Sequence, residues 1–233
     1  MTKRFIITGC GRSGTRYISH LLTNIGLECT HEIYFPHHVY SNYHIIKYYL
    51  AKLGLIKLKW GVPPYGEAAW EAAPFLQYLP SKTIVFHQIR HPLDYIKSRQ
   101  RKGLVYLRIR KHFTNISFYA DTIEGFFNLP LGKQVNYLAK FWIEWNKLVE
   151  LNSKSLEYYR YKVEDLNENK IAFMLSKVNY EYDRDVLAYH VNIIDKNIHT
   201  LNKKKNENIS FDMLESNVYN ELHEISKRYG YSI

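Results

Sequence analysis

Short apolar runs alternate along the chain with segments of helical periodicity. Runs rich in β-branched and aromatic residues predict strands at residues 3–8, 82–90 and 155–163, and the short, more polar run at 27–32 is a candidate second strand. Helical patterns predict helices at residues 14–26, 40–54, 67–79, 92–102, 133–152, 164–178 and 211–228. Strands that alternate with helices are typical of an α/β fold with a mostly parallel sheet.

Glycine and proline mark several of the expected boundaries. Gly26 and Gly54 end two helices, and Pro92 lies in the first turn of another. Pro74 interrupts or starts the helix expected at 67–79. Stretches expected to be mostly turn or loop are residues 60–67, 103–132 and 190–210. Because the 233-residue chain contains no repeat or linker, we expect one domain spanning residues 1–233.

Composition narrows the class of protein only slightly. Apolar residues make up 46% and charged residues 23%, as in an ordinary globular protein. The net charge of +10 indicates anionic partners, which include nucleotides, sulfated or phosphorylated groups, nucleic acid and anionic membrane surfaces. Two cysteines, Cys10 and Cys29, exclude a disulfide framework. With no long apolar run in the sequence, we expect a soluble, cytoplasmic protein without a transmembrane segment.

A glycine-rich stretch follows the first predicted strand and opens the first predicted helix. It reads GCGRSGTR, from Gly9 to Arg16. The N-terminus of a helix presents unpaired N–H groups and partial positive charge, and glycines let an anion approach the backbone. Arg12 and Arg16 add formal positive charge at the same place. The stretch therefore predicts an anion-binding loop.

Three known motifs resemble this loop. An ATP-binding P-loop needs Lys and Ser or Thr after its last glycine, but the chain has Thr15 and Arg16 there. A nucleophile elbow needs glycine where Thr15 stands. The dinucleotide fingerprint G-x-G-x-x-G does match, and Glu28 follows Gly9 by 19 residues, near the place of a ribose-binding acid. A Rossmann-type NAD(P)-binding oxidoreductase therefore remains an alternative.

A second candidate phosphate site follows the strand predicted at 82–90. Arg90 ends that strand, at the edge where open α/β sheets bind ligands. Ser98 comes eight residues later, in the sequence RHPLDYIKS. Arginine suits such a site because its planar guanidinium can bond phosphate through two N–H groups. The two residues can meet at one phosphate only if the helix folds back toward the end of the strand.

Together, RSGT after the first strand and R-x-P-x-x-x-x-x-S after a later one resemble the sulfotransferases that use 3′-phosphoadenosine 5′-phosphosulfate (PAPS). The stretches AAWEAAPFLQYLP, FWIEWNKLVE, YRYKVEDL and ELHEISKRYGY resemble segments of bacterial members, and GTR resembles the carbohydrate-modifying ones. The resemblance implies a P-loop-NTPase-like three-layer α/β/α sandwich. It also implies transfer of a sulfuryl group to an acceptor hydroxyl without a metal, leaving 3′-phosphoadenosine 5′-phosphate (PAP).

The resemblance also implies roles for particular residues. Arg12 takes the position that stabilises charge on the leaving 5′-phosphate. Arg90 and Ser98 would hold the 3′-phosphate, and Tyr17 would either stack on adenine or pack in the core. The remaining residues expected at the donor site are Gly11, Ser13, Gly14, Thr15 and Arg16.

A general base is expected just after the strand predicted at 27–32, because transfer to a hydroxyl requires proton removal. Glu32 is our first candidate, since some bacterial carbohydrate sulfotransferases carry glutamate at this place, and His31 is the alternative. Glu32 pairing with a nearby arginine is the structural interpretation that remains open. The spacing of His31, His37, His38 and His44 is not that of a metal site, so no metal is expected.

Several features remain open or depart from the resemblance. Val163 replaces a common tyrosine, and only Lys203, Lys204 and Lys205 are available for a basic loop over the 3′-phosphate. His87 and His91 flank Arg90 and are expected to support packing. The acceptor is expected to be a glycan, a glycolipid or a small hydroxylated metabolite. A non-catalytic nucleotide- or nucleic-acid-binding module is a further alternative, although no nucleic acid is expected, and the oligomeric state is not predicted.

Overall fold

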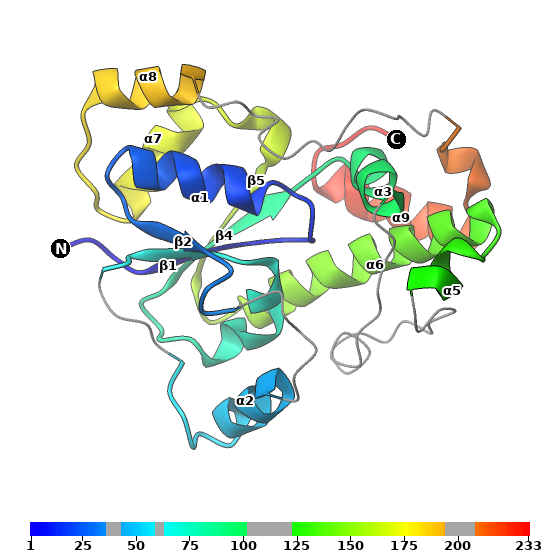
Figure 1. Cartoon of the computed structure of the whole chain (residues 1–233), viewed down its shortest axis with the longest axis horizontal. Coiled ribbons are helices and arrows are strands. Elements are labelled where there is room, and N and C mark those ends of the chain that lie inside the picture. Colours follow the sequence, from blue (N-terminus) through cyan, green and yellow to red (C-terminus); the bar gives the residue numbers. More distant parts are fainter. Residues whose placement is uncertain (36–42, 59–62, 102–122, 194–207) are drawn as a thin grey trace.

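The computed structural model describes residues 1–35, 43–58, 63–101, 123–193 and 208–233. Its centre is a five-stranded parallel sheet in the order β2-β3-β1-β4-β5 (Figure 1). The strands are β1 Phe5–Thr8, β2 Cys29–His31, β3 Gly66–Ala68, β4 Ile84–Ile89 and β5 Glu157–Lys162. The expected α/β fold with a parallel sheet is confirmed.

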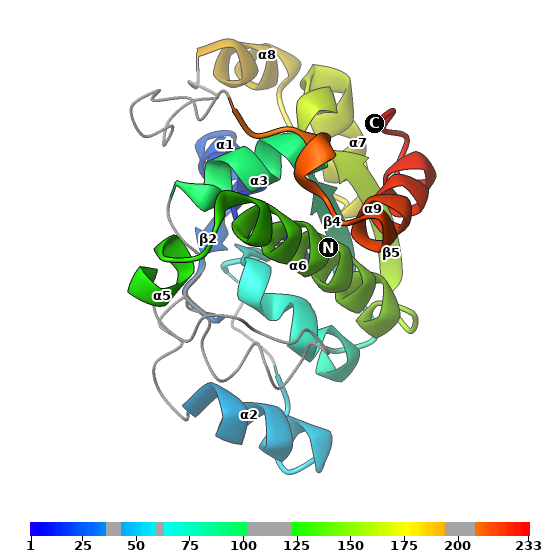
Figure 2. The same cartoon turned by 90° about the vertical axis from the view of Figure 1, so that its right-hand side faces the viewer.

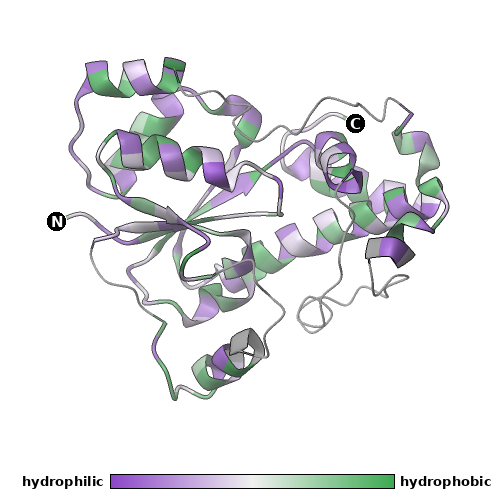
Figure 3. Ribbon diagram, in the orientation of Figure 1, coloured by the Kyte–Doolittle hydropathy of each residue, from purple (hydrophilic) through white to green (hydrophobic). Residues whose placement is uncertain are grey.

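Helices flank the sheet on both faces. The α-helices are α1 Thr15–Asn24, α2 Tyr43–Lys52, α3 Pro92–Gln100, α5 Ile123–Phe127, α6 Leu131–Asn152, α7 Glu168–Lys177, α8 Arg184–Ile193 and α9 Ser216–Arg228. Three 3₁₀ helices are η1 Trp70–Tyr78, η2 Val163–Asp165 and η3 Phe211–Met213. In Figure 1, α1, α7 and α8 lie on one side of the sheet and α6 lies on the other, and Figure 2 shows α9 beside α6. Figure 3 shows these helices alternating between apolar and polar residues, as amphipathic helices do.

The alternation of side chains along β1 divides the core in two. Phe5 and Ile7 pack with α1 and α7, whereas Ile6 packs with η1 and α6. Successive residues of a strand point to opposite faces, so one buried strand contributes to both clusters. Trp142 and Trp145 of α6 are fully buried in the second cluster, which explains why this long helix has so apolar a face.

The structure differs from the expected elements at three places. β3 covers the end of the stretch expected to be turn, 60–67, and the start of the helix expected at 67–79, because its three residues are too few to show a strand pattern. The helix expected at 67–79 is the 3₁₀ helix η1, which contains Pro74. α8 reaches Ile193 and so overlaps the loop expected at 190–210, whose residues 194–207 lie outside the described part.

Two further boundaries shift. The helix expected at 164–178 is preceded by η2 and begins as α7 at Glu168, where the Asn167 side chain accepts a hydrogen bond from the N–H of Lys170. The stretch 103–132 was expected to be mostly loop, but it contains α5, and the long helix α6 already begins within it at Leu131. Within the described ranges, no helix is long and apolar enough to cross a membrane.

We predict that Gly66→Ala destabilises the protein by about 1–3 kcal/mol. A Cβ at Gly66 would lie 2.0 Å from the ring of Phe5, which is buried and packed edge-on against Phe86. Urea unfolding measures the change in the free energy of unfolding. Gly132→Ala is the matched control, because a Cβ there meets its nearest neighbour at 3.8 Å and should change stability by less than about 1 kcal/mol. Equal effects in the two variants would contradict this account of the β1–β3 contact.

Candidate active site at the carboxyl edge of the sheet

The glycine loop lies on the carboxyl end of β4 because Gly9 allows a very close approach. A Cβ at Gly9 would lie 2.0 Å from the carbonyl oxygen of Gln88. Further along the loop, Arg12 and Gly14 both adopt left-handed backbone conformations, with φ values of 76° and 93°. Gly14 caps α1, whose first turn contains no acidic residue. The N–H groups at the start of α1 therefore lie at the edge of the sheet with their partial positive charge unopposed within that turn.

The buried side chain of Gln88 holds this loop by a hydrogen bond from the sheet. Gln88 of β4 donates through its amide nitrogen to the carbonyl oxygen of Ser13. Its Oε1 accepts from the hydroxyl of Tyr161 on β5 at 2.5 Å. The Ser13 hydroxyl turns into the loop and donates to the carbonyl oxygen of Cys10 at 2.5 Å. Gln88 was not among the expected site residues; the hint in the sequence was a glutamine that follows His87 within a strand of apolar residues.

Arg12 connects the two candidate phosphate motifs. Its Nε donates to the Ser98 hydroxyl at 3.3 Å, and its carbonyl oxygen accepts from Nη1 of Arg90 at 2.9 Å. α3 therefore folds back so that Ser98 lies beside the glycine loop, as convergence at one site requires. The indole N–H of Trp142 donates to the carbonyl oxygen of Arg90 at 3.1 Å and anchors the end of β4.

The formal charges nearest to Arg12 are of one sign. Burial lowers the pKa of Arg12, and the neighbouring charges of Arg90 and Arg101 lower it further. In the part of the chain that the structure describes, neither Arg12 nor Arg90 forms an ion pair with a carboxylate. Converging cations cost free energy unless a counter-charge is present. The arrangement therefore suits a multiply charged anion.

The candidate bases lie at the end of β2 and are linked to α1. The Thr15 hydroxyl and Nε2 of His31 are 3.2 Å apart, and the same nitrogen lies 3.9 Å from Oε1 of Glu32. Glu32 adopts a left-handed backbone conformation with φ 53°, and its N–H donates to the carbonyl oxygen of Ala68. The structure thus brings both candidate bases next to the start of the helix that carries the glycine loop.

Glu67, which was not among the expected site residues, organises the turn after Glu32. One of its carboxylate oxygens accepts hydrogen bonds from the N–H groups of Ile33 at 2.7 Å, Tyr34 at 3.0 Å and Phe35 at 3.4 Å. The other oxygen accepts from the hydroxyl of Thr30. Burial raises the pKa of Glu67, while these hydrogen bonds act in the opposite direction. Because Glu67 is fully buried in β3, it holds the turn from inside the fold.

The remaining expected residues are placed as follows. Gly11 packs against the indole of Trp70, where an added Cβ would lie at 3.1 Å. Arg16 is exposed on α1. Tyr17 is buried among the apolar residues between α1 and the sheet, and burial raises its pKa, so its ring packs in the core. A Cβ at Gly14 would lie 3.3 Å from Val163. The valine that replaces the tyrosine common in the sulfotransferases thus lies close to the glycine loop.

The histidines beside Arg90 support packing, as expected. His87 is completely buried between the hydroxyl of Tyr158 at 2.7 Å and Oδ1 of Asn146 at 2.9 Å, and burial lowers its pKa to about 3. His91 packs edge-on against Tyr231. No group of His, Cys, Asp and Glu suited to a metal ion occurs among the described residues. Residues 37, 38 and 203–205, which carry other candidates, lie outside the described ranges.

The strand order bears on the dinucleotide alternative. In the Rossmann order 3-2-1-4-5-6, the second strand lies beside the first. Here β3 lies between β1 and β2. Glu28 precedes β2 and is exposed, so it lies at the amino end of that strand, whereas the glycine loop lies at the carboxyl end of the sheet. The fingerprint GCGRSG therefore lacks its usual surroundings.

Comparison with protein-family models and with curated proteins gives no match for this chain.

We predict that Glu67→Ala lowers the free energy of unfolding by about 3 kcal/mol, because it leaves three backbone N–H groups without their acceptor. Glu67→Gln retains an acceptor oxygen and should cost about 1 kcal/mol. Urea unfolding at neutral pH measures both values. Amide hydrogen exchange at residues 33–35 should be faster in Glu67→Ala than in Glu67→Gln. Equal losses of stability with unchanged exchange would show that Glu67 does not hold this turn.

Proposed function

We propose that the protein is a PAPS-dependent sulfotransferase with a P-loop-like three-layer fold. One observation carries the proposal. Arg12 of the glycine loop contacts Ser98 through its side chain and Arg90 through its carbonyl oxygen. Residues from two distant stretches thus converge at the edge where parallel α/β sheets bind ligands. PAPS carries a phosphate at each end of its ribose and therefore needs two such cationic positions.

The proposed P-loop-like character rests on the position of β1. This strand lies inside the sheet between β3 and β4, and the loop that follows it wraps onto the end of β4. The start of α1 supports binding of the 5′-phosphosulfate through the backbone N–H groups of Gly14 and Thr15, since the N–H of Ser13 donates to the carbonyl oxygen of Cys10 at 3.2 Å. By resemblance to the PAPS-dependent sulfotransferases, Arg12 takes the position of the lysine that bonds the bridging and sulfuryl oxygens, and its charge is already partly desolvated.

In the proposed reaction, the oxygen of an acceptor hydroxyl attacks the sulfur of PAPS. The bond between sulfur and the bridging oxygen breaks, and the electron pair stays on the 5′-phosphate of PAP. Arg12 stabilises that developing charge, and Arg90 and Ser98 hold the 3′-phosphate. Glu32 accepts the proton of the hydroxyl, with His31 as the alternative base. Both bases lie where the Thr15–His31 contact joins β2 to α1.

The acceptor belongs to the class of hydroxylated glycans, glycolipids or small metabolites. Tyr34 is partly exposed in the turn that follows Glu32, and aromatic rings of this kind pack well against sugars. The segments 36–66 and 100–132, rich in Tyr, His, Lys and Arg, are the places proposed for acceptor contacts, and their residues 36–42, 59–62 and 102–122 lie outside the described ranges. The proposal therefore names the donor and the reaction, and it leaves the acceptor as a class.

We predict that the protein binds PAP in the micromolar range without Mg²⁺, and binds ATP and NAD(P)H much more weakly. Arg90→Ala should weaken binding of PAP by about tenfold or more, because it removes a charged donor to the 3′-phosphate. Adenosine 5′-phosphosulfate lacks that phosphate and should bind both proteins equally. Isothermal titration calorimetry measures each affinity. Arg184→Ala on the exposed side of α8 is the matched control. Tighter binding of NAD(P)H than of PAP would overturn the proposal.

We also predict that Glu32→Gln retains binding of PAP but slows sulfuryl transfer by about 100-fold or more, because the hydroxyl loses its proton acceptor. Transfer of radioactive sulfur from PAPS to a set of glycans, glycolipids and phenols is the measurement. His31→Gln, tested beside it, shows which of the two residues is the base. Full transfer activity in both variants would contradict a base at the end of β2.

A further inference from the structure

α2 presents an apolar stripe to the solvent. Ile46 and Leu53 are 54% and 68% exposed, and Tyr49 lies partly exposed between them. Residues three, four and seven positions apart share one face of a helix, so these side chains form a single row. Ala51, on another side of the helix, is buried. The large apolar side chains of Ile46, Tyr49 and Leu53 therefore face the solvent in one row.

The turn after α2 continues the apolar stripe, and backbone hydrogen bonds fix its conformation. The N–H of Leu53 donates to the carbonyl oxygen of Tyr49, and the N–H of Leu55 donates to that of Leu50, both at 2.9 Å. Gly54 supplies the left-handed conformation that closes the turn, with φ 72°. Leu55 is 68% exposed beyond it. The hydrogen bonds hold Leu53 and Leu55 together at the outer end of the helix.

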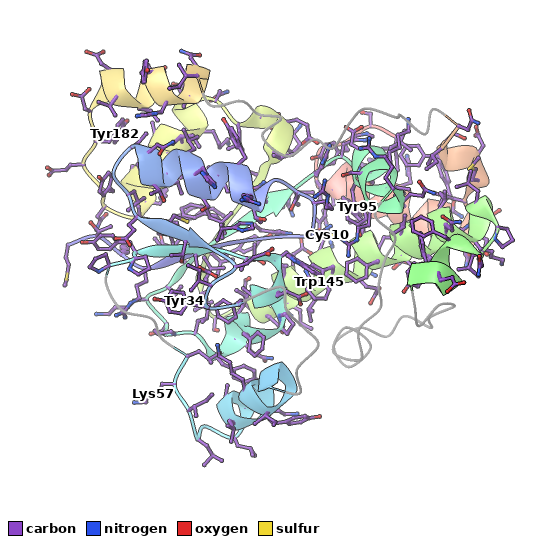
Figure 4. All side chains as sticks on the ribbon, viewed as in Figure 1. Cys10, Tyr34, Lys57, Tyr95, Trp145 and Tyr182 are labelled. Atoms are coloured by element: carbon purple, nitrogen blue, oxygen red, sulfur yellow. The ribbon has the colours of Figure 1, made fainter. Side chains whose placement is uncertain are left out.

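The charge around the stripe is positive. Lys52 and Lys57 are exposed, and neither forms an ion pair within the described ranges. The sequence contains no Asp or Glu from residue 33 to residue 66. Figure 4 shows Lys57 on the outer side of the chain near α2, and both Figure 1 and Figure 2 place α2 at the edge of the molecule, away from the sheet.

α8 offers an instructive contrast. Val186, Tyr189 and Ile193 also form an exposed row at helical spacing, at 40%, 60% and 53% exposure. Acidic residues accompany that row, with Asp183 and Asp185 at the start of the helix. Two apolar stripes of similar exposure therefore differ in the charge beside them, and only the stripe on α2 matches an anionic surface.

We propose that α2 and the following turn, residues 46–57, dock on an anionic lipid bilayer. Protruding Leu and Ile side chains flanked by lysines suit the boundary between headgroups and acyl chains, where apolar residues insert and lysines reach the phosphates. A protein partner would need a complementary groove, whereas a bilayer accepts a convex helix as it is. The positive charge of the segment selects anionic lipids over neutral ones.

The docking segment contacts the turn next to the candidate active site. Nζ of Lys47 donates to the carbonyl oxygen of Tyr34 at 3.0 Å and lies 5.0 Å from the centre of the Phe35 ring. Tyr34 and Phe35 belong to the turn that Glu67 holds. Docking would therefore bring the edge of the sheet that carries Glu32 near the membrane. This inference stands on α2 alone and does not depend on the proposed reaction.

Sedimentation with sucrose-loaded vesicles tests the proposal. We expect the full chain to bind vesicles containing about 30% phosphatidylglycerol at about 0.1 M salt, and not vesicles of phosphatidylcholine alone. The double variant Leu53→Ser, Leu55→Ser should bind about tenfold or more weakly. Lys52→Ser and Lys57→Ser should each weaken binding by about fivefold. Because all four side chains are exposed, these variants should unfold at the same urea concentration as the parent chain.

Two matched controls test whether vesicle binding depends on this site or on exposed apolar and basic side chains anywhere on the surface. The α8 variant Tyr189→Ser, Ile193→Ser removes equally exposed apolar groups, and Lys82→Ser with Lys154→Ser removes exposed lysines elsewhere. Both should bind vesicles as the parent chain does. Absence of vesicle binding, or equal loss in the α8 or lysine controls, would overturn the proposal. So would sedimentation equilibrium showing a dimer that Leu53→Ser, Leu55→Ser dissociates, since the stripe would then cover a second copy.

Discussion

The contact between the glycine loop and the end of β4 is the constraint on which the candidate site depends. Gly9 leaves no room for a side chain against the carbonyl oxygen of Gln88, and the Gln88 amide in turn holds the loop at Ser13. Two backbone segments pressed this closely set the direction of α1 and the path of Arg12. Arg90 follows Gln88 by two residues, so the same contact brings the second cationic group to the loop.

Charge is distributed unevenly around this contact. On the side of β4, Arg12, Arg90 and Arg101 bring positive charges together without a carboxylate partner for Arg12 or Arg90 among the described residues. On the side of β3, Glu67 is a fully buried carboxylate satisfied by backbone N–H groups and a hydroxyl. The arginines have the charge that the proposed anionic donor requires, whereas the hydrogen bonds of Glu67 are made within the fold. The arginines therefore suit binding, and Glu67 stabilises the turn.

Elements with a strong local pattern were predicted well, and those defined by distant partners were not. The apolar run before the glycine loop and the β-branched run before Arg90 became β1 and β4 near the expected boundaries. β3 was missed because three residues, one of them the buried Glu67, carry no strand pattern of their own. It exists because it pairs with both β1 and β2. The same pairing places Glu67 beneath the turn, which no spacing in the sequence indicates.

The sequence by itself determined the glycine loop, the class of fold and the pair of motifs at Arg12 and Arg90, because glycine conformations, strand periodicity and arginine chemistry are local properties. Only the tertiary structure decided that Ser98 meets Arg12, that Tyr17 packs in the core and that Gln88 and Glu67 support the candidate site. It also decided that Ile46, Tyr49 and Leu53 of α2 face outward. These outcomes depend on which surfaces of distant segments meet, and a sheet order such as β2-β3-β1-β4-β5 is set by the burial of the whole chain.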